Sequence, residues 1–295
     1  MENQLNFNNT PQHENMYNFI EQAIRGGISN ISHRHSVANN KCMKTFDPTQ
    51  PSKYIIYLDA NNLYGWAMQQ KLYVGNFKWE NQSVFTLDYI NNLTENDERG
   101  YILEVDLEYP KEIHDYHNSY PLSPERKLIK TSMLSKFQLH LKDKLNISSD
   151  HVEKLICDLT DKTHYKVHYR NLQLYLQLGM ILKCVHRVLS YDQHEWLKDY
   201  IVGNSTLRAD AKKRKAAFSA NLCKIKNNSV FGKQMENVRN RVDIVLIKNK
   251  KQDADDESYS SVDKYLKLCS HPTYKHTTIF NENLVAVHRK KKLYH

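Results

Sequence analysis

One carboxylate and one aromatic ring stand close together after an apolar run. In SKYIIYLDANNLYGWAM (52–68), the apolar residues 54–58 lead to Asp59, and Tyr64 follows five residues later. An apolar run of this length predicts a buried strand over 53–59. A strand that ends in a carboxylate, with a flat ring shortly after it, is a candidate for a binding site.

A second stretch places cations, small residues and a ring on one helical face. Residues 207–230 are strongly helix-forming and basic, and they run into KIKNNSVFGKQMENVRNR (224–241). At roughly 100° per residue, one stripe carries the residues Lys213, Ala217, Ala220, Lys224, Asn228 and Phe231. Lysines can hold phosphates as mobile charges, and a ring beside Gly232 can stack on a base pair, so the stripe suits a nucleoside triphosphate. A basic helix that is merely solvated is the alternative.

Composition favours an acidic partner. The chain has 295 residues, a net charge of +9 and a pI of about 9.1, which indicates a nucleic acid, with a membrane surface as the other class of acidic partner. No window reaches the apolar length of a membrane span, so we expect no membrane partner. The N-terminus is not a signal peptide, and the scattered cysteines contain no C-x-x-C pair. An intracellular setting, the nucleus or a site of viral replication, fits best.

The remaining pattern predicts a mixture of helices and strands. We expect a disordered tail over 1–15, strands over 101–109 and 242–247, and loops over 110–124 and 248–261. Helical patterns cover 16–25, 125–145, 168–189, 191–202 and 207–230. His164 and His168 stand four residues apart and could bind a metal on a helix, but no third ligand is near them in sequence.

The two stretches together resemble family B DNA polymerases of the protein-primed, organellar and viral branch. The string D-x-x-x-L-Y at 59–64 resembles their motif A, and K-x-x-x-N-S-x-F-G at 224–232 resembles their motif B. IRGGIS (24–29) resembles the Y-x-G-G segment, with Ile24 in place of tyrosine. Polymerases of virus-like mobile elements are also similar at 100–110, 167–179 and 231–241.

The resemblance implies an α+β right-hand polymerase core whose antiparallel palm sheet carries Asp59. It implies a partial palm over 16–125, a helical insertion over 126–190, two-helix fingers over 191–235 and a returning palm over 236–295. The chain would act on a DNA template, a primer and a dNTP, with a terminal protein as an alternative primer.

The resemblance also assigns roles to individual residues. Asp59 and the backbone carbonyl of Ala60 would hold two Mg²⁺ ions. The ring of Tyr64 would lie under the deoxyribose and exclude a 2′-hydroxyl. Nucleotide contacts would come from Lys212 (or Lys213, which the helical projection favours), Lys224, Asn228 and Phe231. Template contacts would come from Gly232 and from Gly26 and Gly27, although the glycine pair also reads as a helix C-cap.

A second metal-binding carboxylate is missing from this pattern. The acidic string 253–256 lacks flanking apolar strands, so we do not identify it with motif C, and the chain ends before a motif C is reached. Period-2 alternation places Glu104, Asp106 and Glu108 on one strand face, either solvated or near the metals. We therefore expect little polymerase activity from this chain alone. The alternative function is noncatalytic nucleic-acid binding by a remnant of a mobile-element polymerase.

Overall fold

The computed structural model describes residues 11–26, 28–29, 31–33, 35–147, 152–234, 236, 241–248 and 261–291. The chain divides into two compact units, Met1–Phe231 and Gly232–His295. The helices of the first unit are α1 (Pro11–Ala23), α2 (Leu63–Met68), α3 (Leu87–Asn92), α4 (His114–His117), α5 (Lys136–Lys144), α6 (Tyr169–Gln177), α7 (Lys198–Lys213) and α8 (Ala217–Gln234), the last of which runs three residues into the second unit. Its strands are β1 (Leu72–Glu80), β2 (Arg99–Glu108), β3 (Glu125–Ile129), β4 (Val152–Ile156), β5 (Lys162–His168) and β6 (Ile181–His194).

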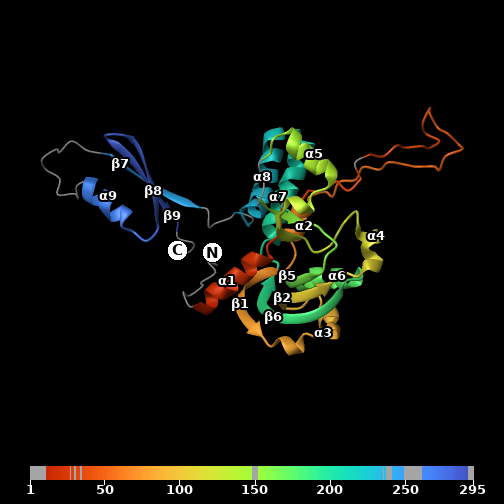
Figure 1. Ribbon diagram of the computed structural model, residues 1–295, viewed down its shortest axis with the longest axis horizontal. Coiled ribbons are helices and arrows are strands. Elements are labelled where there is room, and N and C mark those ends of the chain that lie inside the picture. Colours follow the sequence, from red (N-terminus) through yellow and green to blue (C-terminus); the bar gives the residue numbers. More distant parts are fainter. Residues whose placement is uncertain are drawn as a thin grey trace. The chain divides into compact units, whose positions relative to one another are not determined.

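A four-stranded sheet is the centre of the first unit (Figure 1). Its strand order is β1-β6-β2-β5, and all neighbours are antiparallel. The strand expected over 101–109 is confirmed as β2, in which Leu103, Val105 and Leu107 alternate with polar residues. The mixed α+β class with antiparallel sheets is likewise confirmed.

One face of this sheet carries the main hydrophobic core. Leu103 and Val105 of β2 are fully buried with Ile90 of α3 and Leu172 of α6. Thr86 caps α3, because its side chain accepts a hydrogen bond of 3.2 Å from the Tyr89 N–H. The two short helices therefore shield the apolar side of β2 from water.

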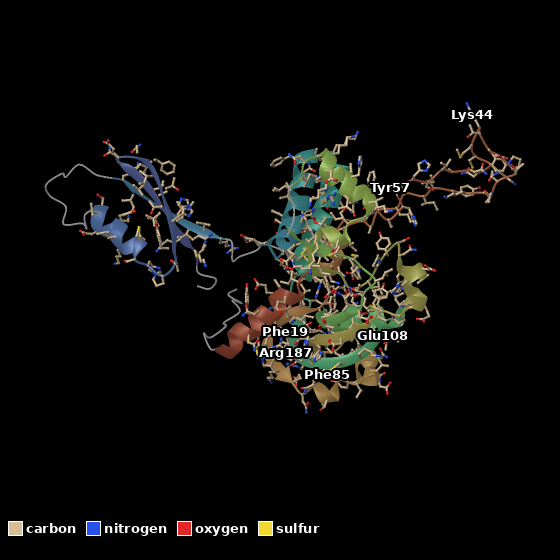
Figure 2. The ribbon with its side chains drawn as sticks, in the orientation of Figure 1. Phe19, Lys44, Tyr57, Phe85, Glu108 and Arg187 are labelled. Carbon is tan, nitrogen blue, oxygen red and sulfur yellow. The ribbon has the colours of Figure 1, made fainter. Side chains whose placement is uncertain are left out.

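Helix α1 covers part of the opposite face. Phe19 is buried against Ile102 and Leu189, and its ring meets Trp79 edge-to-face with centroids 5.0 Å apart. The Arg187 guanidinium lies 5.0 Å from the Phe19 ring centroid; both residues are labelled in Figure 2. Helix α1 extends the predicted helix 16–25 toward the N-terminus. The expectation of disorder over 1–15 is therefore wrong for residues 11–15, and residues 1–10 lie outside the described residues.

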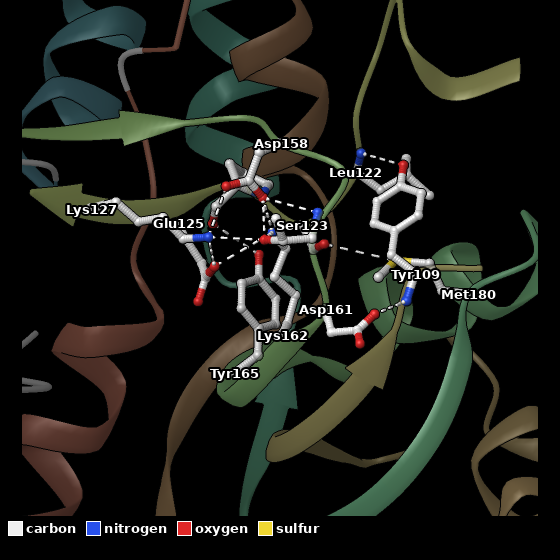
Figure 3. Close-up of polar contacts among 12 residues, drawn as sticks. Tyr109, Leu122, Ser123, Glu125, Lys127, Asp158, Asp161, Lys162, Tyr165 and Met180 are labelled. Atoms are coloured by element: carbon white, nitrogen blue, oxygen red, sulfur yellow. Dashed lines mark hydrogen bonds and ion pairs between the residues drawn. The ribbon is translucent and has the colours of Figure 1, made fainter. Parts of the chain in front are cut away.

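A buried lysine links the antiparallel strand pair β3–β4 to the central sheet (Figure 3). The Lys162 side chain is inaccessible to solvent; its ammonium group pairs with the Asp158 carboxylate and lies 3.4 Å from Glu125. Lys127 completes the cluster, 2.7 Å from Asp158 and 3.1 Å from Glu125. Two cations thus neutralise two carboxylates, which is the condition for burying such charges.

Residues 35–60 form an arm that leaves the rest of the unit and returns to α2 (Figure 1). Near its tip, Asn39 and Asp47 exchange two hydrogen bonds of 2.9 Å, and Asn39 forms an isolated bridge with Lys53. Figure 2 shows Lys44 at the tip of the arm and Tyr57 on its returning side.

The buried strand expected over 53–59 is wrong. Residues 54–60 belong to no helix or strand, and Tyr57 and Leu58 are 91% and 85% exposed. The apolar run pairs with no edge of the described sheet, so hydrophobicity alone does not make it a strand.

Several predicted helices are strands in the structure. The region 168–189 is divided at Gly179, whose φ is +102°, into α6 and the long central strand β6. Strand β6 also occupies the start of the helix expected over 191–202, and strand β3 the start of the one over 125–145. Residues 126–190 are therefore not a helical insertion, because two of their strands belong to the central sheet.

The second unit is a three-stranded antiparallel sheet with one helix. Its strands β7 (Val242–Lys248), β8 (Tyr274–Asn281) and β9 (Leu284–Lys290) pair in the order β7-β9-β8, and α9 (Ser261–Cys269) packs on them. Ile247, Ala286 and Val287 are buried. The strand expected over 242–247 is confirmed as β7. Most of the loop expected over 248–261 lies outside the described residues.

Candidate functional site

Two aromatic rings from distant parts of the chain stack on each other. Tyr64 lies in α2 and Phe231 near the end of α8, and their ring centroids are 4.0 Å apart with an angle of 11° between the planes. Tyr64 remains 49% exposed, and Phe231 is partly buried. The structure therefore brings together the two stretches that the sequence analysis selected.

The sequence NNLYG determines where α2 begins. Asn62 adopts a left-handed conformation with φ of 54°, and its carbonyl accepts the first helical hydrogen bond from Trp66 at 2.9 Å. A methyl group on residue 65 would lie 2.3 Å from the Asn62 side-chain nitrogen, so any larger residue there requires the Asn62 side chain to move. Met68 anchors the other end of α2 in a small core with Leu197 and Ile201.

Helices α7 and α8 form the support behind Phe231. The buried residues of α8 are Ala220, Cys223 and Asn227. The Asn227 amide donates to the Ser205 hydroxyl at 3.3 Å and to the Ile201 carbonyl at 3.4 Å. Asn227 is therefore the structural amide of this segment, while Asn228 is exposed.

The single helix predicted over 207–230 is wrong, because the chain turns between α7 and α8. Lys215 has φ of 57°, and the Ala216 N–H donates to the Ala211 carbonyl at 2.8 Å, which is a helix-ending geometry. Lys213 and Lys224 therefore do not lie on one helix, and the predicted stripe is interrupted. The region 191–235 therefore contains two helices, but the boundary between them lies at 214–216 and not between 202 and 207 as predicted.

The candidate phosphate-binding lysines all reach solvent. Lys212 and Lys213 are in the last turn of α7, and Lys224 is exposed on α8. The Lys213 ammonium lies 3.9 Å from the Asp210 carboxylate at the surface, a pairing too exposed to hold it firmly. Lys224 is seven residues before Phe231, or about 10 Å along the helix axis.

Asp59 and Ala60 lie on exposed coil, not at a strand end. We expected Asp59 to lie on a strand of an antiparallel palm sheet. This expectation is wrong, because none of the strands of the central sheet contains Asp59. Five residues separate Asp59 from Tyr64, so their Cα atoms are at most about 18 Å apart. Asp59 therefore lies within this distance of Tyr64 on exposed coil and not at the edge of a sheet.

The described residues do not fit a complete site for two magnesium ions. Two-metal catalysis requires more than one rigidly held carboxylate, whereas Asp59 is a single one on exposed coil. Across the described ranges, only Asp106, Cys184 and His186 make a group of three or more potential metal ligands, and Asp59 is not part of it.

The three glycines predicted to contact DNA have different surroundings, and one of them is not described by the structure. Gly26 follows the end of α1 by three residues, in coil, and Gly27 lies outside the described residues. Gly232 is exposed, and a methyl group there would meet no atom within 4 Å. Packing within the chain therefore does not require Gly232, and a role in contacting DNA stays a prediction.

The polar face of the sheet holds charged groups that the sequence analysis left unassigned. Glu104 is buried, with its carboxylate 3.0 Å from Lys166 and 2.5 Å from Arg187. Burial raises the pKa of Glu104, but hydrogen bonds from Arg187 and Lys166 outweigh this and leave the pKa below its ordinary value. This position on the face is therefore not solvated. The alternation of β2 revealed the face, but only the pairing with β5 and β6 shows which cations meet it.

The alternative of a helical histidine pair at 164 and 168, which lacked a third ligand, is excluded because both residues belong to strand β5. His168 instead caps α6, with its Nδ1 atom accepting from the Arg170 N–H at 3.3 Å.

Comparisons of the chain with protein-family models, with curated proteins and with solved structures find no match. Among the helices that the structure describes, none is both long enough and apolar enough to cross a bilayer.

Proposed function

We propose that this chain is a DNA-directed DNA polymerase of the family B type, in which α2, α7 and α8 bind the incoming dNTP. The central sheet would be the palm and the α7–α8 pair the fingers. The single observation that supports this most is the stack of Tyr64 on Phe231, because the family resemblance assigns both rings to the same nucleotide.

The exposed face of Tyr64 gives the site its platform. The deoxyribose of the dNTP would lie against this face, where the ring would exclude a 2′-hydroxyl. Phe231 fixes the plane of the Tyr64 ring by covering its other side. The ring is thus oriented before a nucleotide binds, which lowers the entropy cost of binding.

Lys224 and Lys212 would supply the charge for the triphosphate. Both side chains are exposed, so the lysines retain the freedom to follow a phosphate. The reaction is attack of a primer 3′-hydroxyl on the dNTP α-phosphate. Since the described residues do not form a two-metal site, we expect the chain's contribution to be nucleotide and DNA binding, with little primer extension on its own.

Calorimetric titration of the full chain with a dNTP in magnesium buffer tests this proposal. Lys224→Ala should weaken binding about 10-fold or more, because a hydrogen bond to a charged group contributes about 1.5–3 kcal/mol. Lys226→Ala is the matched control, because Lys226 is also exposed on α8 but lies about 200° around the helix from Lys224. Equal affinities for the two variants would reject the site.

Noncatalytic nucleic-acid binding is the second candidate, and the exposure of Asp59 on coil favours it. A binding protein needs the basic α7–α8 surface but not a fixed carboxylate. DNA affinity that falls steeply with salt and is unchanged by Asp59→Ala, together with no measurable dNTP binding, would select this function over the polymerase.

A further inference from the structure

Strands β5 and β6, which flank β2 on opposite sides, each contain a β-bulge opposite β2. The bulges place His164 and His186 next to Asp106. Between β2 and β5, Val105 pairs with Tyr165 and Leu107 with Lys162, so Asp106 faces two residues, one of which is His164. Between β2 and β6, Glu104 pairs with Arg187 and Val105 with Val185, so His186 is an extra residue. Bulges of this kind redirect side chains and are frequent beside functional sites.

The redirected side chains converge. The rings of His164 and His186 stack with centroids 4.1 Å apart. One Asp106 oxygen accepts a hydrogen bond from the backbone N–H of His164 at 2.8 Å. The other Asp106 oxygen lies 2.8 Å from Nε2 of the His186 ring. Cys184 pairs with Asp106 across the strands, and its sulfur is 3.8 Å from Nδ1 of His186. His164 has φ of 51°, a conformation that disfavours residues other than glycine.

Asp106 differs from the carboxylates on either side of it. Glu104 pairs with Arg187 and Lys166, and Glu108 lies 2.7 Å from the Lys183 ammonium. In the part of the chain that the structure describes, Asp106 has no lysine or arginine partner, and it faces imidazole and thiol groups instead. Of the three carboxylates Glu104, Asp106 and Glu108, the middle one thus has no lysine or arginine beside it among the described residues.

We propose that Asp106, Cys184 and His186 bind one divalent transition-metal ion of the zinc class. Their ligand atoms lie within 4.8 Å of one another. Tetrahedral zinc, with bonds of about 2.0–2.3 Å, places ligand atoms roughly 3.3–3.8 Å apart, so modest side-chain rotation closes the site. Thiolate and imidazole favour zinc, cobalt or copper over magnesium. Binding replaces the S–H bond with a metal–sulfur bond and releases the proton to solvent.

The solvent exposure of the three ligands indicates whether the bound ion would be open to water. Cys184 is exposed, while Asp106 and His186 are partly buried, so the ion would have protein on one side and solvent on the other. Three protein ligands leave a fourth position for water, as in catalytic zinc sites and unlike the closed sites of zinc fingers. His164 stacks on His186, and its Nδ1 atom lies 3.3 Å from the Glu104 carboxylate.

Titration of the full chain with Co²⁺ tests the site, because a thiolate–cobalt bond produces a charge-transfer absorption in the near ultraviolet. We expect the band to saturate at one ion per chain and Zn²⁺ to abolish it by displacement. Cys184→Ser should remove the band, whereas Cys42→Ser, which changes another exposed thiol, should leave it unchanged. Absence of the band in the unmodified chain, or its survival in Cys184→Ser, would overturn the proposal.

Alkylation of Cys184, followed by peptide mass mapping, gives a second readout that needs no variant to fold. Zn²⁺ should slow the modification of Cys184 at least 10-fold and leave that of Cys42 unchanged. Asp106→Asn should weaken Co²⁺ binding about 10–100-fold, judging from the effect of altered ligand shells elsewhere. Equal protection of both cysteines would identify nonspecific thiol–metal binding and contradict the site.

Discussion

The ring of Tyr64 lies flat against the ring of Phe231, with centroids 4.0 Å apart, although 167 residues separate them in the sequence (231 minus 64). This contact joins α2 to the end of α8 and leaves the outer side of Tyr64 exposed. The proposed nucleotide site depends on this pair more than on any other feature.

The stack should contribute measurably to folding stability. In a double-mutant cycle of Tyr64→Ala and Phe231→Ala, we expect a coupling energy of about 0.5–1.5 kcal/mol, the range for aromatic pairs. Tyr64→Phe should retain it, because the ring remains. Urea unfolding of the four proteins measures the coupling, and additive single effects would show that the rings do not touch in solution.

Breaking the buried ion cluster should destabilise the first unit. Asp158→Ala leaves the inaccessible Lys162 ammonium with the Glu125 carboxylate, 3.4 Å away, and the neutral Thr160 hydroxyl, 3.3 Å away, so a loss of about 3–5 kcal/mol is expected. Glu195→Ala is the control, because its pair with Lys198 is solvent-exposed and should contribute less than about 1 kcal/mol. Similar midpoints for both variants in chemical unfolding would contradict the buried arrangement.

Stability should depend on pH through His168. Burial lowers the pKa of His168 from 6.5 to about 4, with a smaller contribution from Arg170. The unfolded chain therefore binds a proton at a pH where the folded chain does not. The histidine contribution is complete above pH 6.5 and is lost as pH falls toward 4, by up to about 3 kcal/mol.

Replacement by asparagine isolates this effect, since asparagine can cap α6 but does not titrate. His168→Asn should flatten the slope of unfolding free energy against pH between 6.5 and 4. An unchanged slope would place the pH dependence in other groups.

The turn between α7 and α8 should tolerate glycine. Lys215 occupies a left-handed conformation that glycine adopts without cost, so Lys215→Gly should raise the free energy of unfolding by about 1 kcal/mol. Lys226→Gly, in the interior of α8, should lower it by about the same amount. A lower thermal midpoint for Lys215→Gly would indicate one continuous helix.

This turn shows where sequence patterns stop being informative. The segment around Lys215 contains strong helix formers and neither glycine nor proline, so nothing in it marks a break. Strand β2 was predictable because Leu103 and Val105 alternate with polar groups. Strand β6 was not, because its apolar run suits a helix equally well and its pairing partner β2 lies far away in sequence.

Some residues of the candidate sites could likewise be predicted from the sequence, and others could not. The selection of Tyr64 and Phe231 came from sequence motifs, and the structure places these rings in contact. The strand expected at Asp59 failed because an apolar run also needs a neighbour to pair with. The cluster around Asp106 could not be foreseen, since it depends on bulges in two separate strands. Only the Cys-x-His spacing at Cys184 and His186 offered a signal.

Amide hydrogen exchange of the chain with a dNTP and a primer–template would show whether α2 and α8 bind the nucleotide. We expect slower exchange in α2 and in the part of α8 around Lys224, with no change in α9 or β8. Protection that requires the dNTP and is lost in Lys224→Ala would support the proposed site. Unchanged exchange in α2 and α8, or protection confined to the second unit, would contradict it.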